Sequence, residues 1–591
     1  MSRWTRFAPG LIMAVGLAMT LYHLYTAWFG APDALSFRAI HVAFALVLAY
    51  LIFPAKGNET DNPGPFQFAL AILSVIAAGY LLWAQDYVDN RMIYCVGLAL
   101  PLTAVAFLLY AVFGAGSDLA QLMEQMYLGT EGIFGIPVSV SATYVMLFIL
   151  FGSMVERTGT GKLFMDFALA LTGHTTGGPA KVACITSGLF GTVSGSAVAN
   201  VMTTGAFTIP LMKRLGYRPA FAGAVEAVAS TGGQIMPPIM GAAAFVMAEF
   251  LGVSYLTVAA YALIPAVMYF LAVFLAVHFE AKRTGMKGLP REDLPHLGTV
   301  LREQGHLFLP LAVIVGALVV GYSAPFSALC GIASVLVAAG LRKSTRHYLS
   351  VRNIVEGLVS GARNTISVAL ACGCAGIVIG VISLTGLGIE FTSLVLAASQ
   401  NHLVLALVLT MLAGIVLGMG MPTTPAYIVQ VALLVPALVK LGIVLEAAHM
   451  FTFYFAILSA ITPPVALAVY AANGLSNAGL WETGLTALKL GATGYIVPFM
   501  FVFGPSLLMI GEPFTIAQTA VTAIIGVVCL SSGLAGYLLA PLPIWQRLPL
   551  LAAAIVLIKP GLYTDMIGIA ILVAVAGLNL VLKNRAATDT A

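Results

Sequence analysis

Apolar residues dominate this chain in long continuous runs that recur from one end to the other, separated by short polar stretches. A helix needs about 20 mainly apolar residues to cross about 30 Å of hydrocarbon, and most of the runs reach that length. The runs are continuous rather than alternating, which favours helices over a closed barrel. The pattern therefore predicts an all-α polytopic membrane protein.

The first 116 residues are predicted to form a small module of four membrane-spanning helices. The apolar runs lie at residues 9–30, 37–54, 66–84 and 92–114. The next stretch, residues 117–137, contains Asp118, Glu124 and Glu131 and is too polar to span a membrane. We expect it to be an interfacial linker into a larger module.

The larger module is predicted to cover residues 138–510, and it contains two apolar stretches of unusual form. Residues 180–212 are interrupted by four glycines and end in a basic segment. A re-entrant hairpin explains this form, because two arms of about 14–17 residues reach only the middle of the membrane. Its turn falls at residues 194–196. The basic segment that follows its second arm indicates that both arms begin and end on the cytoplasmic side of the membrane. A second hairpin is predicted over residues 402–440, with its tip at residues 418–424.

Each hairpin is followed by a helix that is expected to break at paired prolines. The first break lies at residues 232–238 of a helix over 219–251, and the second lies in a helix over 447–472. Prolines of the first half, such as Pro237, are each followed at the same distance along the sequence by a proline of the second half, such as Pro463, which indicates an internal repeat. Five predicted membrane crossings separate the two hairpins. Because this number is odd, the hairpins enter the membrane from opposite sides. The repeat is therefore predicted to be inverted, a form typical of secondary transporters.

Composition supports this picture and argues against other classes of protein. Of 591 residues, 60% are hydrophobic and 8% are charged, whereas about a quarter of a soluble domain is charged. The net charge of +4 is small, so nucleic-acid binding is not expected. The chain lacks the zinc-protease motif His-Glu-x-x-His and the phosphate-binding motif of ATP-driven pumps. We therefore expect no enzyme activity and transport driven by a gradient. The further apolar segments over residues 511–591 have no functional interpretation.

The hairpin tips and helix breaks are predicted to form cation and substrate sites near the middle of the membrane. Unwound backbone and Ser or Thr hydroxyls offer oxygens to Na⁺, and half-helix N-termini attract anions. The expected cation ligands are Ser194, Gly195, Thr231, Gly232 and Gly233 in the first half, and Gly418, Gly420, Thr423, Ala460 and Thr462 in the second. The residues expected to bind substrate are Ser196, Asn200, Gln234 and Thr424. The alternative is that these residues only let helices pack closely.

One carboxylate, Glu226, is predicted to lie about two turns inside the membrane on the first broken helix. An ionisable residue within a membrane span indicates a functional site. Carrying a coupling proton and helping to bind the cation are both open roles for it. A local role, in a wet vestibule or in a hydrogen bond to a neighbouring helix, is equally open. His23, His41 and His174 are expected to be ordinary interfacial or hydrogen-bonded helix residues.

Four stretches carry a resemblance to a known family. They are Ser194-Gly-Ser-Ala-Val-Ala-Asn-Val, Gly232-Gly-Gln-Ile-Met-Pro-Pro-Ile, Gly418-Met-Gly-Met-Pro-Thr-Thr-Pro and Ile461-Thr-Pro-Pro-Val. These stretches resemble the large membrane subunit of TRAP (tripartite ATP-independent periplasmic) transporters. The four leading spans look like the small membrane subunit fused in front, and the tips are most similar to those of the TAXI branch.

The resemblance implies a bacterial or archaeal inner-membrane importer that is coupled to Na⁺ and works by an elevator motion. It also implies a small organic anion as substrate, such as a dicarboxylate, 2-oxoacid, glutamate or sialic acid. A separate periplasmic substrate-binding protein would deliver it. The fused small module suggests a monomer. Two alternatives stay open, a receptor-independent organic anion symporter or exchanger of related architecture, and an ion channel.

Overall fold

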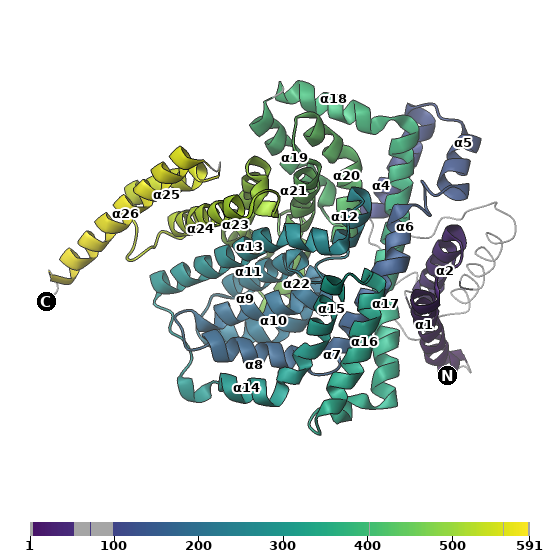
Figure 1. Cartoon of the computed structure of the whole chain (residues 1–591), viewed down its shortest axis with the longest axis horizontal. Helices are drawn as coiled ribbons and strands as arrows, with labels where there is room; N and C mark the ends of the chain where they lie inside the picture. The colour runs from purple at the N-terminus through teal and green to yellow at the C-terminus, as the bar shows by residue number, and fades with distance from the viewer. Residues whose placement is uncertain (1–3, 53–70, 72–98, 401, 559–560, 589–591) are drawn as a thin grey trace. The chain divides into compact units, whose positions relative to one another are not determined.

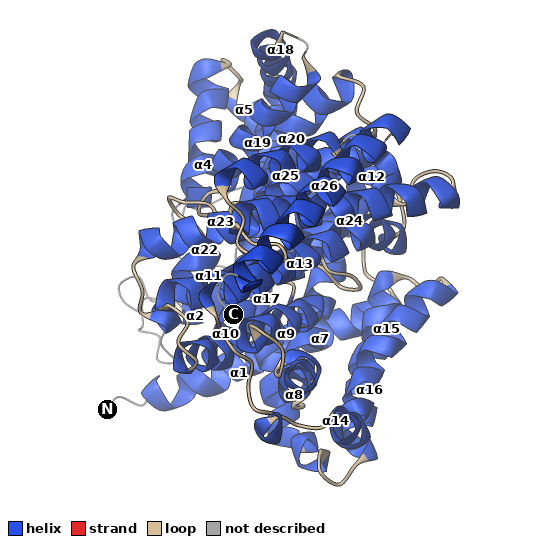
Figure 2. Cartoon of the chain, turned by 90° about the vertical axis from the view of Figure 1, so that its left-hand side faces the viewer, coloured by secondary structure: helices blue, strands red, loops and turns tan. Residues whose placement is uncertain are grey.

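The computed structural model describes residues 4–52, 71, 99–400, 402–558 and 561–588. Within this part of the chain the regular secondary structure is helical, apart from an isolated β-bridge between Tyr537 and Pro541 (Figure 1, Figure 2). Eleven of the described helices are long and apolar enough to cross a membrane. The prediction of an all-α polytopic membrane protein is therefore confirmed.

The chain folds into two compact units whose segments alternate along the sequence. Unit 1 comprises Met1–Thr160, Gly241–Leu256 and Gly305–Leu438, and unit 2 comprises Gly161–Met240, Thr257–Gln304 and Val439–Ala591. The division of the sequence into modules at residues 116, 137 and 510 stays a prediction. The predicted span over residues 66–84, apart from residue 71, lies outside the described residues.

The long helix α17 (Val351–Thr385) is the element of unit 1 on which most of its other helices pack. α1 (Trp4–Phe29), α2 (Ala34–Ile52), α4 (Ala99–Leu109) and α7 (Met146–Glu156) contact it (Figure 1). The other helices of unit 1 are α5 (Leu119–Met123), α6 (Ile136–Val140), α12 (Ala243–Leu251), α15 (Leu309–Val320), α16 (Ala324–Leu341), α18 (Leu387–Ser399), α19 (Leu403–Gly418) and α20 (Thr423–Lys440).

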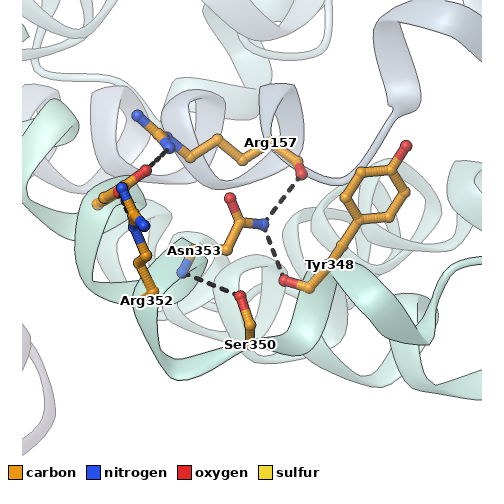
Figure 3. A network of polar contacts seen from close by, with 6 residues as sticks. Arg157, Tyr348, Ser350, Arg352 and Asn353 are labelled. Carbon is orange, nitrogen blue, oxygen red and sulfur yellow. Dashed lines mark hydrogen bonds and ion pairs between the residues drawn. The ribbon is translucent and has the colours of Figure 1, made fainter.

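A polar network connects the end of α7 to the beginning of α17 (Figure 3). Arg157 forms an ion pair of 2.8 Å with Glu356. The Nδ2 of Asn353 donates to the main-chain carbonyls of Arg157 at 3.3 Å and Tyr348 at 2.8 Å, and Ser350 accepts from the Asn353 amide at 3.2 Å. Because Ser350 caps α17, the network fixes where this helix begins.

The helix α11 (Pro219–Gly232) lies in the core of unit 2. It packs against α9 (Gly178–Ser194), α10 (Ala197–Arg214), α22 (Leu467–Ser476) and α23 (Leu480–Phe503), and nearly all of its residues are buried. The other helices of unit 2 are α8 (Thr160–Thr172), α13 (Tyr255–Thr284), α14 (Leu297–Gln304), α21 (Leu445–Leu458), α24 (Pro513–Ala535), α25 (Ile544–Val556) and α26 (Leu562–Thr588).

Both predicted helical hairpins are present, with their turns where the sequence places them. α9 and α10 have 17 and 18 residues and form the first hairpin in unit 2. Its turn includes Gly195 at a φ of 63°, a backbone conformation that glycine adopts without strain. α19 and α20 have 16 and 18 residues and form the second hairpin in unit 1, where Gly420 has a φ of 74°.

Both predicted helix breaks are confirmed. The chain is not α-helical between Gly232, where α11 ends, and Ala243, where α12 begins. α21 and α22 are likewise separated by residues 459–466. The pairs Pro237–Pro238 and Pro463–Pro464 lie inside these breaks. Proline has no backbone N–H and cannot continue the hydrogen-bond ladder of the preceding helix, which explains why the breaks occur there.

Candidate functional site

The carboxylate of Glu226 lies inside unit 2, surrounded by hydroxyl groups. Glu226 belongs to α11 and is completely buried. Its Oε1 accepts hydrogen bonds from Ser187 of α9 at 2.7 Å, from Ser230 of α11 at 3.0 Å and from Thr204 of α10 at 2.5 Å. Its Oε2 accepts a hydrogen bond from Thr208 of α10 at 2.5 Å. Four neutral donors from three helices therefore hold one carboxylate.

Helical spacing and a glycine explain why this arrangement forms. Thr204 and Thr208 are one turn apart on α10, so both hydroxyls lie on the face of that helix that meets α11. Ser230 likewise follows Glu226 by one turn on α11. A Cβ atom on Gly205 would lie only 3.0 Å from the Cγ of Glu226, so the absence of a side chain there gives the carboxylate room.

The described residues give the site hydrogen-bond donors but no opposing charge. No Lys, Arg or His in the described ranges lies within ion-pair distance of Glu226. A buried ionised carboxylate is costly, and a proton or a bound cation would neutralise it. Thr204 and Thr208 have alternative acceptors, the carbonyls of Asn200 at 2.8 Å and of Thr204 at 3.1 Å. The hydroxyls can therefore adjust to either an ionised or a neutral carboxyl group.

An amide side chain ties the two arms together in each hairpin. In the first hairpin Asn200 is completely buried, and its Nδ2 donates to the carbonyl of Ser187 at 2.8 Å. Its Oδ1 lies 3.1 Å from the Thr204 hydroxyl and is an alternative acceptor for the one hydrogen that this hydroxyl otherwise donates to Glu226. In the second hairpin the Nε2 of Gln430 donates to the carbonyl of Gly414 at 2.7 Å. Asn200 is predicted to bind substrate, and in the structure part of its amide is already used inside the hairpin.

The first hairpin and the first helix break meet where Gly191 contacts Gly233. A Cβ atom on Gly191 would lie 2.3 Å from the Cα of Gly233, so the two backbones approach more closely than any side chain allows. Near this contact in the sequence, the hydroxyl oxygens of Ser194 and Thr231 are buried without a hydrogen-bond partner in the described chain. Buried polar groups are normally paired, so these two oxygens are candidate ligands for a cation.

The remaining residues predicted for the first half differ in their exposure. Gly233 lies beside Asn200, since a Cβ on Gly233 would be 3.2 Å from the Asn200 Nδ2. Gly232 packs against a tyrosine ring of α13, and Gln234 is buried. Ser196 is exposed and accepts a long hydrogen bond of 3.4 Å at the beginning of α10. The structure therefore brings Asn200 and Gly233 together and leaves Ser196 accessible.

The tip of the second hairpin belongs to unit 1. Gly418 and Thr424 are buried there, whereas Gly420 and Thr423 are partly exposed. Thr424 lies in the first turn of α20, and the non-helical segment that precedes it ends at Pro422. The first backbone amides of α20 are therefore free of hydrogen bonds within the helix and are available at its N-terminus.

The second helix break belongs to unit 2 and is internally hydrogen-bonded. The hydroxyl of Thr462 lies 2.7 Å from the carbonyl of Leu458 and 2.6 Å from the hydroxyl of Tyr495. The carbonyl of Ala460 accepts from the amide of Ala468 at 2.9 Å. Thr462 and Ala460 are both predicted cation ligands, and each oxygen already has a protein partner.

The hydroxyl residues around Glu226 and the contact of Tyr495 with Thr462 are not among the residues predicted from the sequence. One signal could have found some of them, because Asn200, Thr204 and Thr208 recur every fourth residue and form a polar stripe on an apolar helix. No local pattern marks Ser187 or Tyr495, which reach the site from other helices.

Comparison with known proteins adds a family context. Residues 91–514 match a family model described as "Tripartite ATP-independent periplasmic transporter, DctM component". The sialic acid TRAP transporter large permease protein SiaM of Vibrio cholerae is 25% identical over 382 residues, which are 65% of this chain and 86% of that protein. Both hairpins and both helix breaks described above fall within the residues that match the family model.

Two further relatives cover similar parts of the chain. The isethionate TRAP transporter permease protein DctMQ of Oleidesulfovibrio alaskensis is 22% identical over 496 residues, 81% of this chain and 75% of that protein. The 2,3-diketo-L-gulonate TRAP transporter large permease protein YiaN of Escherichia coli K12 is 24% identical over 381 residues, 63% of this chain and 86% of that protein.

Proposed function

Since the chain belongs to the family of the DctM component of tripartite ATP-independent periplasmic (TRAP) transporters, we propose that it imports a small organic anion, driven by a Na⁺ gradient. It is a multi-pass protein of the bacterial inner membrane. The relatives named for sialic acid, isethionate and 2,3-diketo-L-gulonate support the substrate class, because each of these compounds has a carboxylate or sulfonate on a small polar body.

The observation that carries the proposal is that the hydroxyl oxygens of Ser194 and Thr231 are each buried without a hydrogen-bond partner among the described residues. They flank, in the sequence, the contact between Gly191 and Gly233, where a hairpin tip meets a broken helix. Hydroxyl oxygens and the carbonyls of unwound backbone are the groups that coordinate Na⁺ in transporters built this way. The described residues contain no group of three His, Cys, Asp or Glu that could hold a transition metal, so the available donors fit a hard monovalent cation.

The anionic substrate is proposed to bind where α10 begins. The first amides of a helix point outward and form the positive end of its dipole, which favours a carboxylate or sulfonate. Ser196 is exposed at this point, and its hydrogen bond to the Ala199 amide is long, at 3.4 Å. Gln234 remains a candidate partner for the substrate because it lies in the adjacent break. Asn200 would then act mainly by holding the hairpin in shape.

Delivery by a separate periplasmic binding protein and an elevator motion are further parts of the proposal. The family's printed description supports the first, because it names a tripartite periplasmic transporter. The second is supported by the composition of unit 2. The first hairpin and α11 belong to that one compact unit, so a site built from both can move as one body.

The N-terminal helices are proposed to be a fused small subunit of the TAXI type. α1 and α2 pack on α17, and His41 of α2 is joined to Ser141 by a contact of 2.9 Å. Because these N-terminal helices pack on α17 of the same chain, no second copy of the protein is needed to cover them, and we propose a monomeric permease.

The proposal can be tested by uptake of radiolabelled organic anions into proteoliposomes that contain the full chain, with and without a Na⁺ gradient. Ser194→Ala and Thr231→Val each remove one proposed ligand and should raise the Na⁺ concentration for half-maximal uptake about tenfold. The matched control is Ser393→Ala, whose exposed hydroxyl binds only a carbonyl of its own helix. Identical Na⁺ dependence in all four proteins would refute the cation site. Rapid uptake without any soluble protein would favour a receptor-independent symporter, and currents through single open pores would favour a channel.

A further inference from the structure

A cavity of about 450 Å³ lies within unit 2. Its walls are the C-terminal turns of α13 and α24, the N-terminal half of α23 and the loop before α11. All of these segments belong to the same compact unit. The wall that α24 supplies lies beyond residue 514, where the match to the family model ends.

Two cationic side chains of this cavity have no partner among the described residues. Arg218 and Lys489 are exposed, and their side chains make no hydrogen bond or ion pair with any described residue. A third cation, Arg283, is already paired with Glu280 at 2.6 Å. Glu482 is the other carboxylate in the wall. The unpaired groups therefore leave an excess of positive charge, which favours an anionic ligand.

The rest of the lining is amphipathic. The hydroxyls of Tyr217 and Ser531 are buried without a hydrogen-bond partner among the described residues, and both residues line the cavity. Phe221, Leu490 and Leu534 provide apolar surface beside them. A ligand that fits the cavity must therefore combine negative charge with hydrocarbon.

The cavity faces the cytoplasmic side of the membrane. Lys213 and Arg214 end α10 beside the loop that forms one wall, and Lys282 and Arg283 end α13. Basic residues at the ends of membrane helices mark the cytoplasmic side. Basic pockets between helices on that side bind the head groups of anionic lipids.

We propose that this cavity binds the phosphodiester head group of an anionic membrane phospholipid. Arg218 and Lys489 bind the phosphate, and the apolar wall contacts the first carbons of the acyl chains. Free phosphate shares the charge of the head group but cannot use the apolar wall. A lipid bound there would contact α24 together with α11, α13 and α23 of the same unit, which gives α24 a role.

Native mass spectrometry of the detergent-purified full chain tests the proposal. The protein is exposed to equal amounts of phosphatidylglycerol and phosphatidylcholine, and bound lipid is measured after detergent removal in the gas phase. We expect selective retention of phosphatidylglycerol. Each Lys or Arg near an anionic lipid surface contributes about a factor of five, so the double variant Arg218→Gln/Lys489→Gln should bind phosphatidylglycerol about 30-fold more weakly.

Two further variants make the outcome unambiguous. Lys282→Gln removes an exposed cation that does not line the cavity and should leave binding unchanged. Ala535→Trp fills the cavity, keeps every charge and should also weaken binding; size-exclusion chromatography and circular dichroism show whether it is folded. Equal retention of both lipids, or equal losses in the double variant and in Lys282→Gln, would overturn the proposal. Displacement of the lipid by millimolar inorganic phosphate would instead assign the cavity to a soluble phosphate ligand.

Discussion

The hydroxyl of Thr208 lies 2.5 Å from Oε2 of Glu226, whereas the other three hydroxyls around this carboxylate reach Oε1. Thr208 can also turn its hydrogen toward the carbonyl of Thr204 at 3.1 Å. Oε2 is therefore the oxygen that can take up a proton, or face a cation, while the hydrogen bonds to Oε1 stay in place. The hydrogen bonds to Oε1 therefore fix the position of the carboxylate, while Oε2 can change its partner.

The first prediction is that Glu226→Gln strongly reduces uptake. The substitution keeps the size of the side chain but replaces one acceptor oxygen by an NH₂ group that faces a hydroxyl donor. A hydrogen bond to a charged group contributes about 1.5–3 kcal/mol, so we expect an initial uptake rate about 10- to 100-fold lower in proteoliposomes. Normal uptake with an unchanged ion dependence would show that Glu226 has no functional role.

The same variant separates the roles that the sequence leaves open. A changed Na⁺ concentration for half-maximal uptake would indicate cation binding, and a flattened pH dependence of uptake would indicate proton transfer. A lower melting temperature alone would indicate a local structural role. Thr208→Val should reproduce part of the effect. Thr172→Val is its matched control, because that hydroxyl donates only to a carbonyl one turn away in α8.

A second prediction concerns the backbone contact at the first helix break. Gly191→Ala places a Cβ 2.3 Å from the Cα of Gly233, and backbone atoms cannot yield as a flexible side chain would. We expect the hairpin and the break to separate, with loss of uptake and a destabilisation of about 1–3 kcal/mol. Gly474→Ala in α22 of the same unit meets no atom within 4 Å and should be tolerated. Equal melting temperatures for the two variants would contradict the contact.

Much of the fold could be predicted from the sequence, because hydropathy and helix-breaking residues report on local structure. The hairpin turn at Gly195 and the breaks at Pro237 and Pro463 lie where glycine and proline indicated them. The surroundings of Glu226 could not be predicted in the same way. Ser187 precedes Glu226 by 39 residues, and only the packing of α9 on α11 brings the two together.

The predicted cation ligands show the same difference between what residue type indicates and what tertiary packing decides. Ser194 and Thr231 were proposed because hydroxyls near a break suit a cation, and the structure leaves both without a partner among the described residues. Thr462 was proposed on the same reasoning, yet its hydroxyl is already bonded to Tyr495 at 2.6 Å. Residue type indicates what a side chain can bind, whereas only tertiary packing determines whether that capacity is still available.

A third prediction compares the amide residues of the two hairpins. Asn200→Leu removes the donor to the Ser187 carbonyl, and Gln430→Leu removes the donor to the Gly414 carbonyl. Each change leaves a buried carbonyl without that bond and should destabilise the protein by about 1–3 kcal/mol, measured as unfolding in detergent. Only Asn200→Leu should also alter the Na⁺ dependence of uptake through the first hairpin. Identical effects of both variants on that dependence would contradict a Na⁺ site at the first hairpin.

A fourth prediction concerns a chain of hydrogen bonds that ties the N-terminal helices to the rest of unit 1. The Nδ1 of His23 lies 2.7 Å from the Met19 carbonyl, its Nε2 lies 2.9 Å from the Nδ1 of His41, and the Nε2 of His41 lies 2.9 Å from the hydroxyl of Ser141. A carbonyl only accepts, so the Nδ1 of His23 must donate. The direction of every later bond then follows, with both rings neutral and Ser141 as the final donor.

Because each member of this chain orients the next, His41→Phe and Ser141→Ala should not act independently. Each single variant should destabilise the protein by about 1–3 kcal/mol, since it leaves a buried polar group unpaired. The double variant should cost less than the sum by about 1 kcal/mol, as measured by unfolding in detergent. His347→Phe, at an exposed histidine of the same unit, should change the stability little. Strict additivity of the two single effects would show that His41 and Ser141 do not interact, and that packing alone attaches α2 to the rest of the unit.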